Sequence, residues 1–216
     1  MKELESVIAK YLQEAHSFFK YKDSEGRDLN VVFVFENHPD YLTKYLSFYS
    51  QLPNLTEVVV FACDGTFKLT QNGLEYFIKH PHQEVFIDRE GHERGIKPDV
   101  LKEMRTRILK RIGDLVKAKT FDELMLIIES EKIAGFGELA IYDTTMRIAS
   151  FLKLEPDKVY LHAGTRSGMK KLEQRGLVPP GSSKLKAVLV DYLPEPLKKL
   201  RPADTEHLLC WGKEQL

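Results

Sequence analysis

Residues 120–152, TFDELMLIIESEKIAGFGELAIYDTTMRIASFL, say more about the fold than any other part of the chain. Thr120 stands three residues before Glu123, the spacing of a capping box that begins an α-helix. Apolar residues then recur at helical spacing, at Phe121, Leu124, Ile127 and Ile128. A second helical stripe follows, at Leu139, Tyr142, Met146 and Ala149. The stretch therefore predicts two amphipathic helices joined by a short turn.

The turn between these helices contains two glycines, in the order Gly135-Phe136-Gly137. Glycine permits positive φ and lets another backbone or a ligand approach closely. The amides of the hairpin and of the following first helical turn have no intrahelical acceptor. Such a helix start binds anions, and a nucleic-acid phosphate is a common one. We therefore expect a phosphate-binding hairpin.

This arrangement, h-x-G-h-G followed by a helix, resembles the helix–hairpin–helix motif of DNA-binding proteins and of the helix–hairpin–helix DNA glycosylase superfamily. The resemblance covers the motif and at most the C-terminal half of the chain. It implies contact with the DNA backbone through Gly135, Phe136 and Gly137, and it allows a monovalent cation at the hairpin, with no other cofactor. Lys132 would add positive charge beside the hairpin.

The chain departs from the glycosylase pattern at both catalytic positions. Leu139 stands where many of these enzymes have a Lys nucleophile, and His162 stands where they have a catalytic Asp. The resemblance therefore favours nucleic-acid binding with little sequence specificity over base excision. Two alternatives stay open, namely a glycosylase-like or nucleoside-processing enzyme with a non-standard active site, and a structural domain that binds another protein. Whether the chain is an enzyme is not decided.

Composition places the chain among ordinary globular proteins, with 43% apolar and 30% charged residues in 216. The longest apolar runs are too short to cross a bilayer. The N-terminus has acidic residues within its apolar pattern and does not read as a signal peptide. Cys63 and Cys210 are isolated, which favours a reducing compartment. We expect a cytoplasmic protein without membrane contact.

Charge is distributed unevenly, although the formal net charge is zero. Residues 1–99 hold 11 Lys and Arg against 16 Asp and Glu, whereas residues 100–216 hold 21 against 16. The basic half contains the hairpin. A basic helix face, expected within residues 102–117, would add salt-dependent attraction to DNA.

The expected fold is mainly α, with a helical domain that contains the helix–hairpin–helix and one or two short strands in the N-terminal third. Helices are predicted over residues 2–20, 39–50 and 99–118. Residues 29–35 read as a strand or a buried helix, and residues 70–98 read as a loop rich in Gly, His and Pro. The expected domains are residues 1–98 and residues 99–216, unless the two form one continuous domain.

Two groups of residues in the first 150 positions are candidates for catalysis or ligand binding. His80 and His82 flank Pro81 and could act in acid–base catalysis or bind a metal. No second Cys or His pair at metal-ligand spacing accompanies them, so no metal site is predicted. Asp143 has Arg147 four residues later, which indicates a structural salt bridge or a catalytic carboxylate.

A third group is the segment His162-Ala163-Gly164-Thr165-Arg166, where a helix start and an Arg suit a phosphate. Catalysis, if present, is assigned to Asp143 and His162, in a cleft that His80, His82 and Tyr142 would line, and Arg166 is assigned to nucleic-acid contact. The chain contains no G-x-x-x-x-G-K-[ST], G-x-G-x-x-G or G-x-S-x-G motif. These absences disfavour nucleotide hydrolysis and serine hydrolase chemistry.

Overall fold

The computed structural model describes residues 1–87 and 90–216, which divide into two compact units. Unit 1 consists of Met1–His16, Phe35–Leu42 and Pro156–Leu216, and unit 2 consists of Ser17–Val34 and Thr43–Glu155. Residues 1–98 and residues 99–216 each contribute to both units. Neither unit is therefore a continuous stretch of chain.

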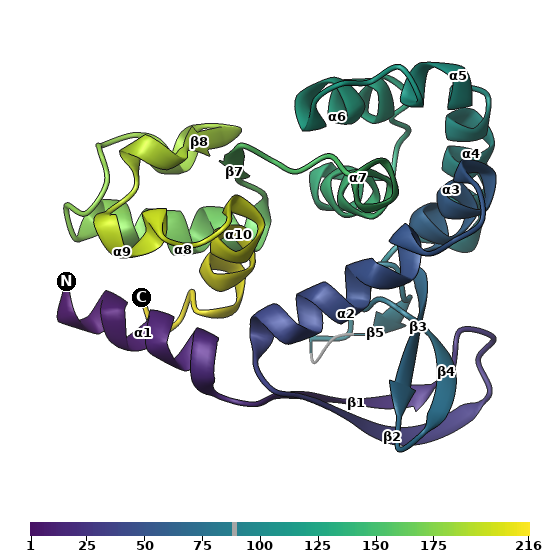
Figure 1. The fold of residues 1–216 in the computed structure, drawn as a ribbon, viewed down its shortest axis with the longest axis horizontal. Helices are drawn as coiled ribbons and strands as arrows, with labels where there is room; N and C mark the ends of the chain where they lie inside the picture. The colour runs from purple at the N-terminus through teal and green to yellow at the C-terminus, as the bar shows by residue number, and fades with distance from the viewer. Residues whose placement is uncertain (88–89) are drawn as a thin grey trace. The chain divides into compact units, whose positions relative to one another are not determined.

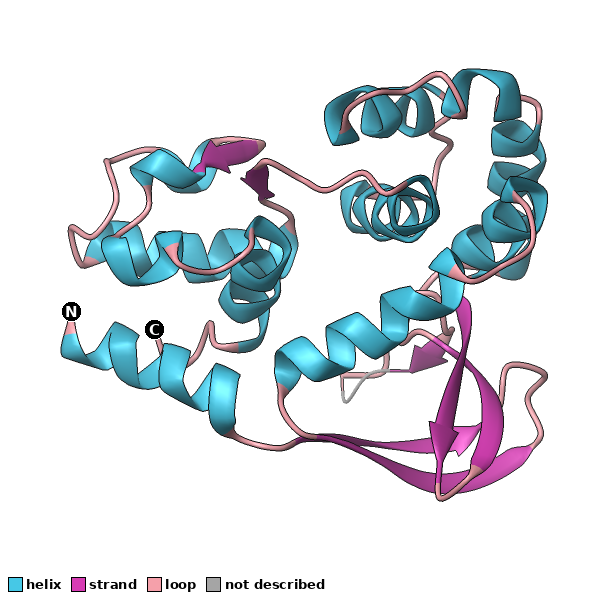
Figure 2. Cartoon of the chain, viewed as in Figure 1, coloured by secondary structure: helices cyan, strands magenta, loops and turns pink. Residues whose placement is uncertain are grey.

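The prediction of a mainly α fold is wrong, because the protein is mixed α/β (Figure 2). About 50% of the residues are helical and 17% lie in strands, and the described residues form ten α-helices and four two-stranded sheets. Within residues 1–87 and 90–216, no helix is long and apolar enough to cross a membrane.

Unit 1 packs the first helix of the chain against its last segments (Figure 1). Its regular elements are α1 (Lys2–Gln13), β7 (Lys158–Tyr160), α8 (Ala163–Gln174), β8 (Ala187–Leu189), α9 (Glu195–Lys198) and α10 (Pro202–Trp211). The short strands β7 and β8 pair antiparallel. The apolar stripe of α1, namely Leu4, Val7, Ile8 and Tyr11, is buried in the same core as Leu208 and Leu209 of α10.

The strands of unit 2 account for most of the error in fold class. They are β1 (His16–Lys22), β2 (Asp28–Phe35), β3 (Thr66–Gln71), β4 (Leu74–Lys79), β5 (Phe86–Ile87) and β6 (Glu93–Arg94), paired as β1–β2, β3–β4 and β5–β6. The helix expected over residues 2–20 ends at Gln13, and the aromatic-rich segment that follows is β1. Residues 29–35, which the sequence left open as a strand or a buried helix, lie in β2.

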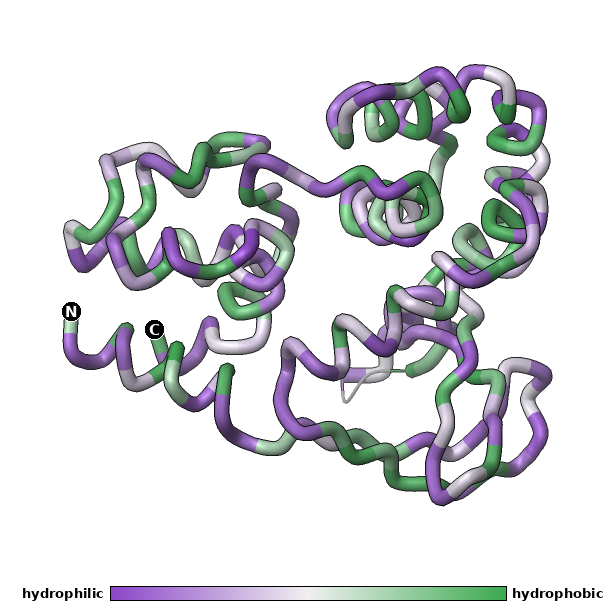
Figure 3. Tube along the Cα trace, viewed as in Figure 1, coloured by the Kyte–Doolittle hydropathy of each residue, from purple (hydrophilic) through white to green (hydrophobic). Residues whose placement is uncertain are grey.

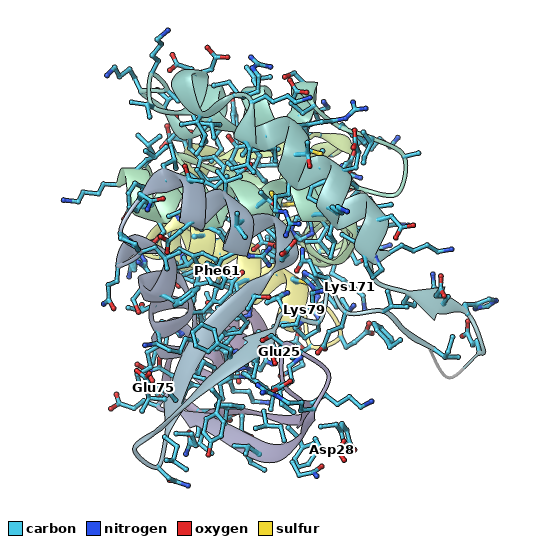
Figure 4. The ribbon with its side chains drawn as sticks, turned by 90° about the vertical axis from the view of Figure 1, so that its right-hand side faces the viewer. Glu25, Asp28, Phe61, Glu75, Lys79 and Lys171 are labelled. Carbon is cyan, nitrogen blue, oxygen red and sulfur yellow. The ribbon has the colours of Figure 1, made fainter. Side chains whose placement is uncertain are left out.

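The expected loop over residues 70–98 contains a β-hairpin instead, apart from residues 88–89, which lie outside the described residues. Asn72 and Gly73 have φ of 53° and 75° and connect β3 to β4 with Gln71 paired to Leu74. Asn-Gly is the preferred two-residue hairpin turn because both positions need positive φ. Figure 4 shows Glu75 and Lys79 at opposite ends of β4. After Lys79 the chain continues into the turn that begins at His80.

The helices of unit 2 include the pair that the sequence predicts. They are the later part of α2 (His38–Ser50), α3 (Leu55–Asp64), α4 (Pro98–Leu109), α5 (Ile112–Leu115), α6 (Phe121–Ser130) and α7 (Glu138–Leu152). Thr120 accepts a hydrogen bond from the Glu123 amide at 3.1 Å, and Gly137 is the N-cap of α7, so both helices are confirmed. Figure 3 shows both hydrophobic and hydrophilic residues along α6 and α7. The helix predicted over residues 99–118 is interrupted between α4 and α5.

Candidate functional site

The site is built on a tight turn that follows β4. The amides of Gln83 and Glu84 donate to the His80 carbonyl oxygen at 3.0 and 3.2 Å. Pro81 occupies the second position of this turn, where its fixed φ is favourable. The His80 amide donates to the Gly65 carbonyl oxygen at 2.8 Å, which ties the turn to the end of α3. The His80 and His82 rings consequently lie in a fixed edge-to-face arrangement with centroids 4.5 Å apart.

Asp143, from the second turn of α7, meets both imidazoles. Its Oδ2 lies 2.8 Å from His82 Nδ1 and 4.0 Å from His80 Nδ1. Burial alone would raise the pKa of Asp143, but the charge and hydrogen bond of His82, with Arg147 and His80 behind it, hold that pKa well below its ordinary value. Asp143 is therefore a carboxylate that only accepts, and His82 Nδ1–H is the donor.

At His80, in contrast to Asp143, the effect of burial on the pKa outweighs the attraction of the neighbouring opposite charge. Its side chain is largely buried, and this burial lowers its pKa well below the ordinary value despite the attraction of Asp143. The charges of His82, Arg147 and Lys20 act in the same direction as burial. His80 is consequently neutral at physiological pH, and its Nδ1 accepts a hydrogen bond from the His82 amide at 3.4 Å.

Arg147 lies one helical turn after Asp143 and is fully buried. Its Nη2 is 3.7 Å from Asp143 Oδ2, so the ion pair predicted from their spacing is confirmed. Its donors are directed elsewhere, with Nε to the Tyr45 hydroxyl, Nη1 to the Ala62 carbonyl at 2.7 Å and Nη2 to Gln83 Oε1 at 2.9 Å. Arg147 thus compensates the buried carboxylate and also fixes the His80–Gln83 turn.

A pocket of about 400 Å³ joins this cluster to the hairpin, a volume typical of small-molecule sites. Its lining comes from the His80–Gln83 turn, from the region of β5 and β6, and from the hairpin and start of α7: Pro81, His82, Phe86, Arg94, Gly95, Ile96, Gly135, Gly137, Leu139 and Ala140. The His82 side chain is 37% exposed, so it is accessible while its partner Asp143 is largely enclosed.

The two hairpin glycines that line the pocket, Gly135 and Gly137, are needed for different reasons. Gly135 has φ of 88°, and a Cβ there would lie 3.2 Å from Val100 Cγ2, so the fold itself requires glycine. Gly137 has an ordinary φ of −80° and makes no side-chain capping bond, and a Cβ added there would meet nothing within 4 Å. The buried Phe136 ring anchors the loop between them. The open backbone at Gly137 is therefore where a ligand has room to approach.

In comparisons with protein-family models, curated proteins and solved structures, the chain matches none. The site geometry is therefore the basis for assigning a function.

Much of the expected basic face is paired with carboxylates. Arg105 contacts Asp64 at 2.7 Å, and Arg107 contacts Glu103 at 2.7 Å. Arg111 contacts both Asp114 and Glu131. These pairs reduce the positive charge that the face can offer to a polyanion. Lys132 beside the hairpin is exposed, and Arg94 lines the pocket.

His162 and Arg166 belong to unit 1, whereas the pocket belongs to unit 2. His162 Nε2 lies 2.5 Å from Glu206 Oε1, which also accepts from the Thr165 hydroxyl at 2.6 Å. Arg166 Nη2 donates to the Leu161 carbonyl at 2.9 Å. Gly164 allows α8 to approach α10, because a Cβ there would lie 2.4 Å from Cys210 Sγ. These contacts give the residues of the His162–Arg166 segment a structural role, which is to pack α8 against α10 within unit 1.

Of the residues predicted for a cleft, the structure brings His80, His82 and Asp143 together. Tyr142 is buried with its ring 6.1 Å from that of Phe121, so it packs α7 against α6. Sequence reasoning missed Gln83 and Gly95. Gly95 is required because its φ is 88° and an added Cβ would lie 1.7 Å from the Glu84 carbonyl oxygen, and both are properties of the folded chain that the sequence does not show.

The same three side chains are the group within the described residues that could hold a metal ion. His80, His82 and Asp143 each offer one ligand atom, an imidazole nitrogen or a carboxylate oxygen, and these atoms all lie within 4.8 Å of one another. Chemically, the pair of His82 and Asp143 can also act without metal. An imidazole whose Nδ1–H is held by a carboxylate keeps Nε2 as a proton acceptor, which is the arrangement of a general base.

Proposed function

We propose that unit 2 binds a nucleic-acid backbone, with DNA as the expected partner, through the amides at Gly137 and the start of α7. The observation that carries this proposal is the open backbone of Gly137 at the edge of a pocket. A helix start offers unsatisfied N–H groups and the positive end of the helix dipole. A phosphate placed there makes contacts that do not depend on base sequence.

The pocket beside the hairpin extends this contact. A phosphate at Gly137 would leave an attached sugar or base next to the apolar walls formed by Leu139, Phe86 and Ile96. Lys132 is exposed beside the hairpin and Arg94 lines the pocket, and both are positively charged. Because Arg105, Arg107 and Arg111 are paired with carboxylates, the binding is expected to be weak and to involve few phosphates.

Fluorescence anisotropy with a labelled duplex tests the proposal. Two or three phosphate contacts predict that affinity falls roughly 10- to 40-fold between about 50 and 200 mM salt. Duplexes of unrelated sequence should bind within a few-fold of one another. Absence of binding near 50 mM salt would reject the proposal and favour a domain that binds another protein.

A second function has one specific observation in its favour, which is that His82 lines the pocket while Asp143 holds its Nδ1. A general base at this position could activate water against a nucleotide bound at the hairpin. This reading corresponds to a nucleoside- or nucleic-acid-processing enzyme with a non-standard active site.

We also propose a cytoplasmic location, since Cys63 and Cys210 form no disulfide in the described chain.

A further inference from the structure

We propose that His80, His82 and Asp143 form a binding site for a divalent transition-metal ion at the wall of the pocket. The inference does not depend on nucleic-acid binding, because it follows from how three ligand atoms are arranged. Two imidazole nitrogens and one carboxylate oxygen converge from the turn after β4 and from α7.

The relationship between His80 and Asp143 points to a cation. His80 Nδ1 accepts the His82 amide at 3.4 Å, so this nitrogen carries a lone pair and no proton, and a metal bound there would replace that long hydrogen bond. Asp143 Oδ2, also an acceptor, lies 4.0 Å away, beyond hydrogen-bonding distance. Two acceptors this close, with no proton between them, can both bind one cation once the His82 amide is released.

The spacing fits a metal after small movements. Metal–ligand bonds of about 2.0–2.1 Å in tetrahedral geometry place ligand atoms roughly 3.3 Å apart. The observed separations from Asp143 Oδ2, 2.8 Å to His82 and 4.0 Å to His80, lie on either side of that value. A binding metal would take the place of the His82 Nδ1 proton, which His82 can carry on Nε2 instead.

The positive charge of Arg147 repels a metal ion bound at Asp143 and so lowers its affinity. Its Nη2 is 3.7 Å from Asp143 Oδ2, but its hydrogen bonds are made to Tyr45, Ala62 and Gln83. Asp143 therefore keeps lone pairs for another cation, at an affinity that Arg147 reduces. The 37% exposure of His82 provides a path from the pocket.

The ligand set selects the class of ion. Two imidazoles and one carboxylate suit Zn²⁺, Co²⁺ or Fe²⁺ and disfavour Mg²⁺, which prefers oxygen ligands. Three protein ligands leave a position open for water, as in catalytic and not structural zinc sites. The open position would lie beside the pocket, within reach of a molecule bound there.

Equilibrium dialysis of the chelator-treated full chain against Zn²⁺, Co²⁺ and Mg²⁺ tests the proposal. We expect one equivalent of Zn²⁺ or Co²⁺, little Mg²⁺, and at least tenfold weaker Zn²⁺ binding in His80→Ala, His82→Gln and Asp143→Asn. The matched control is His92→Ala, because His92 is exposed and outside the cluster. Unchanged Zn²⁺ binding in the His80 or His82 variant would overturn the proposal, as would no saturable binding by the wild type.

A second measurement keeps the test decisive if a variant fails to fold. Imidazole ¹⁵N spectra of the wild-type protein, recorded with and without Zn²⁺, should show shifts of Nδ1 in two histidines, His80 and His82. Shifts confined to other histidines would place the metal elsewhere and reject the site. Loss of DNA binding in the separate anisotropy experiment would leave these outcomes unaffected.

Discussion

His82 and Asp143 are 61 residues apart in the chain, and their side chains share a 2.8 Å hydrogen bond in unit 2. The bond links the turn after β4 to α7, whose N-terminus carries the hairpin. The candidate base and the candidate phosphate-binding backbone are therefore parts of one rigid helix and one tight turn. Changes at the buried pair should therefore affect stability, whereas changes at the exposed hairpin backbone should affect mainly binding.

Gly137→Val should weaken duplex binding about tenfold or more, while the poorer N-cap lowers the free energy of unfolding by only about 1 kcal/mol. The valine has free space in the protein alone, but it would block the approach of a phosphate to amides worth roughly 1.5–3 kcal/mol in a charge-assisted contact. Gly113→Val on α5 is the matched control, because Gly113 also has open space. Equal anisotropy titrations for the two variants would show that the hairpin is not the contact.

Arg147→Met should destabilise the protein by about 3–5 kcal/mol, since it leaves the buried Asp143 without a compensating charge. Urea unfolding at neutral pH measures the change. Arg105→Met is the control, because the Arg105–Asp64 pair is partly exposed and worth at most about 1 kcal/mol. Similar losses in both variants would contradict a central structural role for Arg147.

Gly65→Ala should be more destabilising than Gly26→Ala, although both positions have positive φ. Positive φ costs an alanine roughly 1–2 kcal/mol at either position. At Gly65 the new Cβ would also lie 2.6 Å from Gln83 Oε1, whereas Gly26 has open space. Denaturant titration gives the difference, and equal effects would mean that Gln83 moves without cost.

Acidification should lower the free energy of unfolding of unit 1 through protonation of His38, whose side chain is buried with 3% exposure. Burial, with a smaller effect of His16, lowers the His38 pKa to about 4. The unfolded chain, with a pKa of about 6.5, then binds the proton first, so stability is complete above pH 6.5 and is lost as pH falls toward 4. The contribution lost by about pH 5 is on the order of 2 kcal/mol.

The pH test compares urea unfolding of wild type and His38→Phe at about pH 7 and pH 5. The groups around His38 are the rings of Tyr11, His16, His207 and Trp211. His16 also has a pKa lowered by burial and acts in the same direction. The variant should lose less stability than wild type on acidification, and identical losses would exclude His38 as the cause.

Excision of uracil or oxidised guanine from duplex DNA is not expected. Leu139 lines the pocket without an amine, and His162 contacts Glu206 within unit 1. Such excision needs a nucleophile or a carboxylate that stabilises positive charge on the sugar. A strand-nicking assay on modified-base duplexes tests this expectation. Nicking that disappears in Asp143→Asn would make the enzyme reading correct.

The sequence alone determined the elements whose signals are local. The capping box at Thr120 and the glycines at 135 and 137 were sufficient to predict α6, the hairpin and α7, because capping and helical periodicity depend on residues a few positions apart. The hairpin at Asn72-Gly73 was equally local, and its omission was an error of interpretation that contributed to the wrong fold class. The spacing of Asp143 and Arg147 also predicted their ion pair correctly.

Only the tertiary structure decided which of the candidate side chains meet. His80 and His82 join Asp143 because β4 ends beside α3 and directs the following turn toward α7, a result of packing between segments distant in sequence. The same packing assigns His162 to unit 1 with Glu206. Periodicity identifies the face of a helix that is buried, but it carries no information about which distant segment covers that face.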